Sequence, residues 1–372
     1  MANNLVKKKF RLVCLEGESN SIGKNQGELI KNNPQILQFF AAKRKLISSK
    51  DLKQLNDIFE EFCPHLLCEI NGFAEVLEVP VENLRYFDYT WLKPRCSQFA
   101  ILPSKSEESK LFAARNYDFS YRFEDMRLCK TSVKNSYSHL GFSTLLFGRT
   151  DGINEKGLTI TMSSAGFPVG KLQSLRNPKI IGLQFWAVVR AILDTCKNID
   201  EAIKLVEQIP MAYNANFIVA DKSNSIALIE SFDGNIAYKK IDSSTNENFL
   251  CATNHVVLSE LIHYDSSKMH NSRVRFELIE STLKKSKLIS KDGIKRILSD
   301  LYPNGLCCHY YTEFFGTMNS VIYDPNEMKI DLCFGPSDIN PWYSMKFDEI
   351  KNSEYEVFFP KEKAPNGFWE IE

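Results

Sequence analysis

Residues 96–119 read CSQFAILPSKSEESKLFAARNYDF, in which a polar segment separates two apolar runs. The separating segment, 103–110, is rich in Pro, Ser, Lys and Glu, a composition typical of the turn between two antiparallel strands. Such a hairpin returns the end of the second strand to the start of the first, so Arg115 and Asp118 can face Cys96. A thiol near a guanidinium and a carboxylate is a candidate nucleophile.

Further pairs of strand-like runs follow along the chain, each bridged by turn-forming residues. The pairs are 143–149 with 157–163, 215–221 with 225–232, and 317–323 with 328–334. Helical patterns stand between them in blocks, over 179–209 and 268–300, and Asn198 or Asp200 can cap the second helix of the first block. Hairpins in runs and helices in blocks predict an α+β fold in which helices cover antiparallel sheet.

The chain ahead of Cys96 has a different pattern, and we expect residues 1–95 to be helical. Apolar residues are spaced along 22–46 and recur at intervals of three and four over 51–77. Pro80 is expected to open a short further helix that extends through Tyr89. The change of character at Cys96 predicts a helical N-terminal segment, 1–95, followed by a catalytic part, 96–372.

The bulk composition limits the function classes. With 372 residues and 44% apolar side chains, the chain can bury a large core. Lys plus Arg and Asp plus Glu both number 46, and this balance disfavours a nucleic-acid-binding surface. We find neither an apolar run of signal-peptide length nor one long enough to cross a bilayer. We therefore expect a cytoplasmic protein that binds neither nucleic acid nor membrane, and the sequence leaves a homo-oligomer open.

The cysteines follow no disulfide framework, which favours reduced and mostly buried thiols. Their positions are 14, 63, 68, 96, 129, 196, 251, 307, 308 and 333. Two groups deserve a test as zinc ligands: Cys307, Cys308 and His309 in succession, and Cys63 with Cys68 flanking His65. Neither group forms a paired C-x-x-C unit, so the sequence disfavours a zinc site. We predict no metal and no cofactor.

A free cysteine is a weak nucleophile at neutral pH, because a pKa of about 8.5 leaves only a few per cent as thiolate. Arg115 can favour the anion electrostatically without competing for its proton. Asp118 can orient that guanidinium or bind an ammonium group near the thiol. An arginine–carboxylate pair on neighbouring strands is also common without any catalytic purpose.

Several motifs, taken together, resemble the choloylglycine hydrolase and penicillin acyltransferase-like group of N-terminal-nucleophile hydrolases. In that group a cysteine begins the mature chain and precedes a hairpin that ends in Arg-Asn-x-Asp. The corresponding and later motifs here are Cys96, Arg115-Asn116-Tyr117-Asp118, DGINEKGL at 151–158, Thr253-Asn254, Ser272-Arg273 and GTMNSVIYDPNEMKIDLCFG at 316–335. The resemblance extends from about residue 16 to residue 336.

Two details place the chain within that group. A helical segment with glycine-spaced start, GESNSIGKNQGEL at 17–29, precedes the cysteine and resembles the acyltransferase-like branch. Where bile-salt enzymes carry an active-site asparagine after the Lys-Gly-Leu strand, this chain has Met162-Ser163-Ser164. This departure disfavours a bile-salt substrate.

The resemblance implies a four-layer αββα sandwich of two antiparallel sheets, and autocatalytic cleavage between Arg95 and Cys96. The new α-amino group, with a pKa of about 7.7 to 8.0, would serve as the base for the Cys96 thiol. Asn254 would donate to the oxyanion, and Arg273 would stabilise charge in the same pocket. The substrate would be a small linear amide, cleaved through a thioester whose acyl group passes to water or to an acceptor amine.

Other interpretations remain open at this point. Asn154 can simply form a turn, so we leave it out of catalysis. Arg273 and Arg275 lie two apart at the start of a helix, and we expect one of them to be a solvated surface charge; Ser272-Arg273 fits the family better. A papain-like hydrolase would use Cys96 with His255 or His309 and need no cleavage. A small-molecule binding protein on the same scaffold would keep an unprocessed, buried Cys96.

Overall fold

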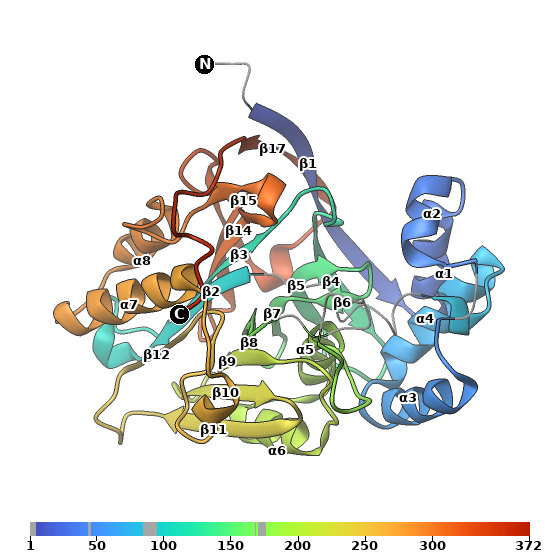
Figure 1. Ribbon diagram of the computed structural model, residues 1–372, viewed down its shortest axis with the longest axis horizontal. Helices are drawn as coiled ribbons and strands as arrows, with labels where there is room; N and C mark the ends of the chain where they lie inside the picture. Colours follow the sequence, from blue (N-terminus) through green and yellow to red (C-terminus); the bar gives the residue numbers. More distant parts are fainter. Residues whose placement is uncertain (1–4, 44–45, 85–94, 168, 170–175) are drawn as a thin grey trace.

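The computed structural model describes residues 5–43, 46–84, 95–167, 169 and 176–372. Two β-sheets lie face to face near the centre, and helices cover their outer sides (Figure 1). Within the described residues ten strands form the larger sheet and seven the smaller. The expected α+β class is confirmed.

The larger sheet contains the N-terminal strand and the middle of the chain. In spatial order its strands are β11 (Asn235–Ile241), β10 (Ile226–Phe232), β9 (Ala215–Ala220), β8 (Thr159–Ser164), β7 (Asp151–Asn154), β5 (His139–Thr144), β4 (Arg127–Val133), β1 (Leu5–Gly17) and β17 (Ser353–Pro360), with β6 (Gly148–Arg149) paired to β5. The pairs are antiparallel except β1 with β4, which run parallel. The expectation of a wholly antiparallel sheet is therefore wrong at this one pair.

The smaller sheet contains the hairpin that begins at Cys96. In spatial order its strands are β12 (Phe249–Ala252), β2 (Arg95–Ile101), β3 (Phe112–Phe119), β14 (Phe315–Asp324), β15 (Lys329–Phe334) and β16 (Trp342–Lys346), with β13 (His309–Tyr310) paired to β14. These pairs are all antiparallel. β14 pairs with β3, so the last of the motifs, at 316–335, lies next to the hairpin that begins at Cys96.

Eight α-helices lie within the described residues. They are α1 (Ser19–Ile30), α2 (Pro34–Phe40), α3 (Ser49–Phe62), α4 (Pro64–Leu77), α5 (Phe185–Thr195), α6 (Ile199–Gln208), α7 (His270–Lys285) and α8 (Lys291–Ser299). α5 and α6 pack on the larger sheet, α7 packs on β2 and β12, and α8 packs on β3. Because β2 and β3 also contact β8 across the centre, the order of layers is αββα, as the family resemblance implied.

Strand alternation divides the residues of β2 and β3 between two cores. Phe99 and Phe112 pack with Ile279 of α7 and Leu298 of α8 on the outer face of the smaller sheet. Cys96 belongs instead to the core between the two sheets. Because both faces of these strands are covered, almost all of their residues are buried, the polar ones included. The same alternation places the thiol between the sheets.

One segment contradicts the expectation that residues 1–95 are helical. Leu5–Gly17 forms β1, which inserts into the larger sheet between β4 and β17. Its alternation is visible in the sequence as buried Phe10 and Leu12 separated by exposed Arg11, but the lysine-rich start obscures it. The N-terminal segment is thus partly built into the catalytic sheet.

Most of the other expected elements are confirmed. The segments 22–46 and 51–77 contain α1 to α4, and 179–209 and 268–300 each hold two helices, with Asn198 capping α6 through the Glu201 backbone amide. The expected helix from Pro80 to Tyr89 begins as a single turn at Val81–Asn83, and residues 85–94 lie outside the described residues.

Three of the four expected hairpins are confirmed: β2 with β3, β9 with β10, and β14 with β15. The fourth is wrong, because β8 pairs with β7 rather than with the run 143–149. That run breaks at Leu145 and Leu146, which both have positive φ angles, 55° and 69°. A left-handed backbone at two consecutive bulky residues ends a strand, and the apolar pattern alone does not show it.

Candidate active site

Cys96 lies at the start of β2 and is fully buried, with 0% exposure. In the β2–β3 register it stands opposite Tyr117, so its side chain points into the space between the two sheets with those of Gln98 and Arg115. Gln98 continues this face with hydrogen bonds to Ser163 and Thr161 of β8. The two sheets therefore enclose the thiol.

The structure brings Arg115 to the thiol, as expected. Its Nη2 lies 3.0 Å from Sγ of Cys96. The same guanidinium donates to Asp151 Oδ2 at 2.7 Å, to the carbonyl of Met162 at 2.7 Å and to Thr150 Oγ1 at 3.2 Å. These bonds fix the plane of the cation. Asp151, the first residue of the DGINEKGL motif, is a site residue that the sequence analysis missed.

Asp118 contacts the nucleophile through its backbone and not through its carboxylate. The residue is three positions from Arg115 on β3, so the two side chains leave opposite faces of the strand. The Asp118 backbone amide hydrogen-bonds to the Cys96 sulfur. Its Oδ1 accepts from Thr317 Oγ1 at 2.7 Å, whereas Oδ2 is buried and has no hydrogen-bond partner among the described residues.

Burial raises the pKa of the Asp118 carboxyl to about 6. The positive charge of Arg275, the Thr317 hydrogen bond and the charge of Arg115 oppose that rise without cancelling it. A carboxyl group with this pKa titrates just below neutral pH and is mostly ionised at pH 7.

Asn254 also lies beside Cys96, as expected. Its Oδ1 accepts from the Cys96 backbone amide at 3.4 Å and from Arg275 Nη2 at 2.8 Å. Its Nδ2 donates to the carbonyl of Ser164 at 2.9 Å, and its backbone amide donates to Ser272 Oγ at 2.8 Å. The side-chain amide is thus held with its oxygen toward Cys96 N and Arg275.

The prediction that Arg273 shares this pocket is wrong, and Arg275 takes its place. Arg275 is fully buried and donates to the Cys96 carbonyl at 2.8 Å and to Ser97 Oγ at 2.7 Å. Arg273 has a side chain 30% exposed and pairs instead with Glu277 and Glu372. Two residues two positions apart on α7 differ by about 200° around the helix axis, so only one can face the sheet.

Burial raises the pKa of the Cys96 thiol to about 11. The Arg115 charge, the Asp118 backbone amide and the hydrogen bond from Arg115 favour the thiolate, while the Asp118 charge opposes it. The cost of placing an anion between two sheets outweighs this support. In the intact chain the thiol is therefore neutral near pH 7.

The two histidines considered as bases contact other groups. His255 Nδ1 lies 2.8 Å from Ser272 Oγ, and burial together with the charges of Lys268 and Arg275 lowers its pKa to about 4. His309 Nε2 lies 3.0 Å from Asp338 Oδ1. Neither imidazole points toward Sγ of Cys96. This disfavours both histidines as the base for the Cys96 thiol.

Asn154 forms the turn that the sequence analysis assigned to it. Its Oδ1 accepts from the backbone amides of Lys156 and Leu158, and its Nδ2 donates to the carbonyls of Leu193 and Cys196. All four hydrogen-bonding positions of the side-chain amide are thus used within the turn and α5.

A buried ion pair joins the N-terminal segment to the catalytic part. Arg190 of α5 donates to Glu69 of α4, with Nη2 2.8 Å from Oε1, and it also lies 3.4 Å from Asp194. Both side chains are almost completely buried. With β1 in the larger sheet and Gln26 of α1 bonded to Arg127, this pair attaches residues 1–95 firmly to the rest of the chain.

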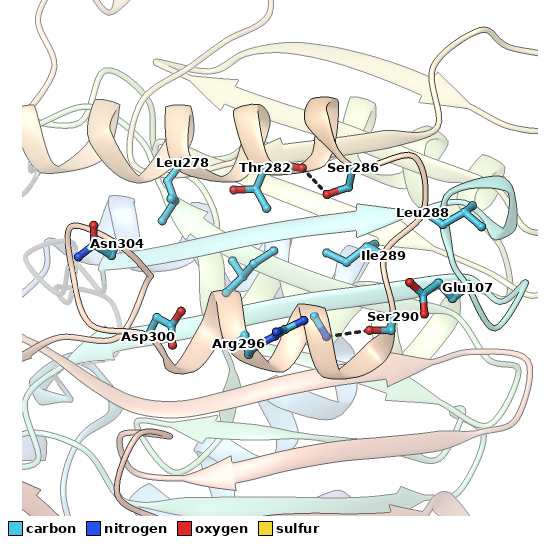
Figure 2. A pocket seen from close by; sticks show the side chains of 12 residues that line it. Glu107, Leu278, Thr282, Ser286, Leu288, Ile289, Ser290, Arg296, Asp300 and Asn304 are labelled. Carbon is cyan, nitrogen blue, oxygen red and sulfur yellow. Dashed lines mark hydrogen bonds between the residues drawn. The ribbon is translucent and has the colours of Figure 1, made fainter.

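A cavity of about 370 Å³ lies away from Cys96, between α7 and α8 (Figure 2). Its lining includes Leu278, Thr282 and Ser286 of the first helix and its end, and Arg296 of the second. Figure 2 shows these side chains facing each other across the gap, on the outer side of the smaller sheet. None of the lining residues contacts the thiol, so the cavity is separate from the candidate site.

Among the described residues, no helix has both the length and the apolar character needed to cross a membrane.

No curated protein sequence matches the chain. Similar solved structures include penicillin V acylase from Agrobacterium tumefaciens, 17% identical over 68% of this chain and 87% of that chain, with a TM-score of 0.44. A variant of conjugated bile acid hydrolase from Clostridium perfringens is 10% identical over 73% of this chain and 99% of that chain, with a TM-score of 0.43.

The family assignment depends on a different comparison. Residues 105–338 match the model of a family described as acyl-coenzyme A:6-aminopenicillanic acid acyl-transferase. The match covers more than half of the chain and contains Arg115, Asp118, Asn254 and Arg275, while Cys96 lies nine residues before its start. This description agrees with the penicillin acyltransferase-like group that the motifs resembled. The chain belongs to the acyl-coenzyme A:6-aminopenicillanic acid acyl-transferase family.

Proposed function

We propose that the protein is an autoprocessed cysteine amidohydrolase or acyltransferase that acts on a small linear amide. The observation that carries the proposal is the pair of contacts to Cys96. Arg115 Nη2 donates to the Cys96 sulfur at 3.0 Å, and the Cys96 backbone nitrogen donates to Asn254 Oδ1 at 3.4 Å. These contacts support the proposed roles of the sulfur as nucleophile and of the backbone nitrogen as the future base.

Hydrolysis of the Arg95–Cys96 bond would supply the base. The step consumes one water, leaves a carboxylate on Arg95 and converts the Cys96 amide nitrogen into an α-amino group. Asn254 Oδ1 already accepts from this nitrogen, and the buried Oδ2 of Asp118 has no partner among the described residues. Asp118 pairs with Arg95 in the β2–β3 register, so this residue lies beside the proposed cleavage point. A protonated amine there would satisfy its unpartnered Oδ2.

The acylation step then needs no histidine. The α-amine takes the thiol proton as Sγ attacks the substrate carbonyl, and the same proton passes to the nitrogen that leaves. The S–C bond forms, the C–N bond breaks, and the acyl group remains as a thioester. Water or an acceptor amine next attacks the thioester and restores the thiol. Arg115 stabilises the sulfur while it carries negative charge.

Asn254 is the proposed donor to the oxyanion. Arg275 holds the amide oxygen at 2.8 Å, which directs Nδ2 away from the cation and toward the carbonyl of Ser164. Nδ2 donates to the carbonyl of Ser164 at 2.9 Å and to its Oγ at 3.3 Å, so the second N–H would exchange Ser164 Oγ for the developing charge. A well-aimed donor of this kind contributes about 3 kcal/mol to the transition state. Arg275 is proposed as the residue that positions it.

The two fragments should remain together after cleavage. The larger sheet holds β1 between two strands of the other fragment, and the Glu69–Arg190 pair is buried between helices of both. Separation would expose strand edges and leave two buried charges without partners, which is strongly unfavourable.

The ten free thiols suit a reducing compartment, and we propose the cytoplasm.

Intact mass measurement combined with N-terminal sequencing tests the proposal. Active wild-type protein should give two masses under denaturing conditions, with a new N-terminus at Cys96, and one species under native conditions. Cys96→Ala should remain a single uncleaved chain, whereas Cys251→Ala, which alters another buried thiol, should be cleaved normally. Active wild-type protein that stays a single chain would contradict the proposed processing and would favour a Cys/His hydrolase or a binding protein.

A further inference from the structure

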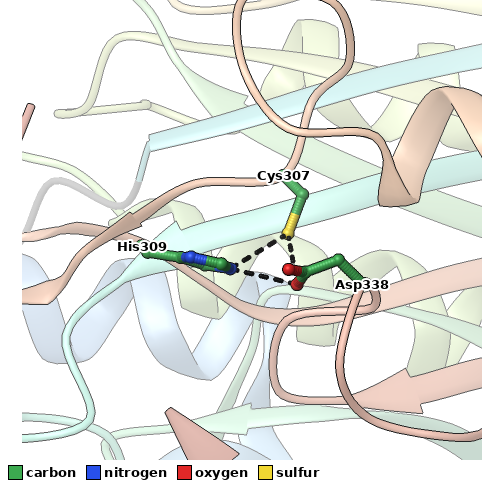
Figure 3. Close-up of side chains that lie close together, drawn as sticks. All are labelled: Cys307, His309 and Asp338. Carbon is green, nitrogen blue, oxygen red and sulfur yellow. Dashed lines mark hydrogen bonds and ion pairs between the residues drawn. The ribbon is translucent and has the colours of Figure 1, made fainter. Parts of the chain in front are cut away.

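We propose that Cys307, His309 and Asp338 form a binding site for a divalent metal ion of the zinc type. Cys307 precedes β13, His309 begins β13, and Asp338 lies in the loop after β15. The chain folds so that one ligand atom from each residue points to a common centre (Figure 3). The site is separate from the Cys96 nucleophile and uses none of the residues assigned to it.

The distances among the three ligand atoms fit tetrahedral coordination. Cys307 Sγ lies 3.4 Å from Asp338 Oδ1 and 3.9 Å from His309 Nε2, and Nε2 lies 3.0 Å from Oδ1. Zinc bonds of about 2.3 Å to sulfur and about 2.0 Å to nitrogen or oxygen, at tetrahedral angles, give ligand separations of about 3.3 to 3.6 Å. The observed triangle is centred on that range, so small side-chain shifts would complete it.

The histidine is oriented as a metal ligand usually is. Its Nε2 faces the thiol and the carboxylate, while Nδ1 lies 3.1 Å from Oε1 of Glu362. A carboxylate on the far nitrogen of a ligating histidine holds the proton there and leaves the near nitrogen free to bind. Without a metal, a protonated His309 between the two carboxylates and a hydrogen bond from Cys307 Sγ to Asp338 Oδ1 account for the same contacts, so metal binding itself must be measured.

Charge and access also suit a divalent cation. A thiolate, a carboxylate and a neutral imidazole together carry two negative charges, which one such ion neutralises. The His309 side chain is 3% exposed and that of Asp338 is 20% exposed, so the carboxylate marks the side from which an ion can enter. Three protein ligands leave the fourth position to water.

Thr317 links the proposed metal site to Asp118. Cys308, between two of the ligands, donates its backbone amide to Thr317 Oγ1 at 3.0 Å and accepts from the Thr317 amide at 2.8 Å. Thr317 Oγ1 in turn donates to Asp118. A bound metal would fix the 307–309 segment and, through Thr317, the carboxyl group beside the cleavage point.

Cobalt titration of the purified full chain, stripped with a chelator, tests the site. Co²⁺ should bind at about one ion per chain and give the near-ultraviolet charge-transfer band of a cobalt–thiolate bond, with the intense visible bands of tetrahedral geometry. Zn²⁺ should displace it. Cys307→Ser should lose the charge-transfer band, while Cys68→Ser, which removes an exposed thiol, should keep it. Wild-type protein without the band, or a band that survives in Cys307→Ser, would overturn the proposal.

A second variant avoids the risk that a buried substitution prevents folding. Glu362 is half-exposed, and Glu362→Gln removes only the carboxylate on the far nitrogen of His309. Its affinity for Zn²⁺ should fall about 10- to 100-fold, with the melting temperature of the metal-free form unchanged. Glu349→Gln, at an exposed glutamate elsewhere, is the matched control. Equal affinities in both variants and wild type would also count against the site.

Discussion

Cys96 and Cys307 are both buried thiols of the smaller sheet and its edge, yet their surroundings are opposite in charge. Cys96 faces the Arg115 guanidinium, which also donates to the Asp151 carboxylate. Cys307 faces the Asp338 carboxylate and an imidazole. A fixed cation stabilises a thiolate that has to react as a nucleophile. A carboxylate and an imidazole support a thiolate only when a metal ion joins them.

The comparison shows that burial alone does not tell which thiol is functional. Burial raises the pKa of Cys96 to about 11 and raises that of Cys196 to about 11 as well. What separates Cys96 is the company of Arg115, Asn254 and Arg275, and a backbone nitrogen that can become an amine. The following predictions test that distinction, beginning with the largest expected effect.

Removing the thiol itself should abolish both cleavage and turnover. Cys96→Ala should lose all detectable hydrolysis of a linear amide, because no other group in the site can form the thioester. Amide turnover, measured by release of the amine, should be normal in Cys251→Ala. If turnover persisted in Cys96→Ala, the nucleophile would have to be sought at another cysteine.

Arg275 and Arg273 provide a matched pair on one helix. Arg275→Gln should lose several kcal/mol of stability and process slowly, because it leaves Asp118 and the Asn254 oxygen buried with fewer partners. Arg273→Gln should cost less than about 1 kcal/mol and process normally, since its ion pairs are largely solvated. Urea unfolding measures stability, and intact mass measures processing. Equal costs would return Arg273 to the site.

Asp118 should make stability fall as pH rises through the acidic range. The unfolded carboxyl loses its proton near pH 4, while the folded one keeps it until about pH 6. Within that window the folded state binds more protons, so the wild type loses stability with rising pH, by up to about 3 kcal/mol, and the loss is complete above pH 6. Asp118→Asn cannot titrate there.

The measurement is urea unfolding of an uncleaved background, Cys96→Ala with and without Asp118→Asn, from pH 4 to pH 8. The stability advantage of the asparagine variant should grow between pH 4 and pH 6 and stay constant above. An advantage that does not change with pH would show that the Asp118 carboxyl has an ordinary pKa.

The smallest effect is expected at His255. Loss of a general base costs about 100-fold or more in rate, but His255 is assigned a structural role beside Ser272. His255→Gln, which keeps hydrogen-bonding capacity, should therefore change amide turnover by much less than about 100-fold and leave processing complete. A loss of the full size would favour a histidine-assisted mechanism at Cys96.

Much of the fold was readable from local patterns, and the part that was missed depends on residues distant in sequence. The hairpins at β2–β3, β9–β10 and β14–β15 were predicted because apolar runs and turn residues stand side by side in sequence. β1 was missed because its alternation lies among lysines at a sheet position fixed by β4 and β17, both distant in sequence. Pairing partners of that kind leave no mark on the strand itself.

The sequence by itself predicted Cys96, Arg115 and Asn254 as neighbours in one site, because each belongs to a motif whose residues are close together along the chain, and the structure brings the three together. Only the tertiary structure decided between Arg273 and Arg275, since the rotation of α7 against the sheet selects which one is buried. Only the tertiary structure also brought Asp338 to Cys307 and His309, across about thirty residues of intervening chain. Contacts between distant segments depend on how whole elements pack, and no local spacing encodes that.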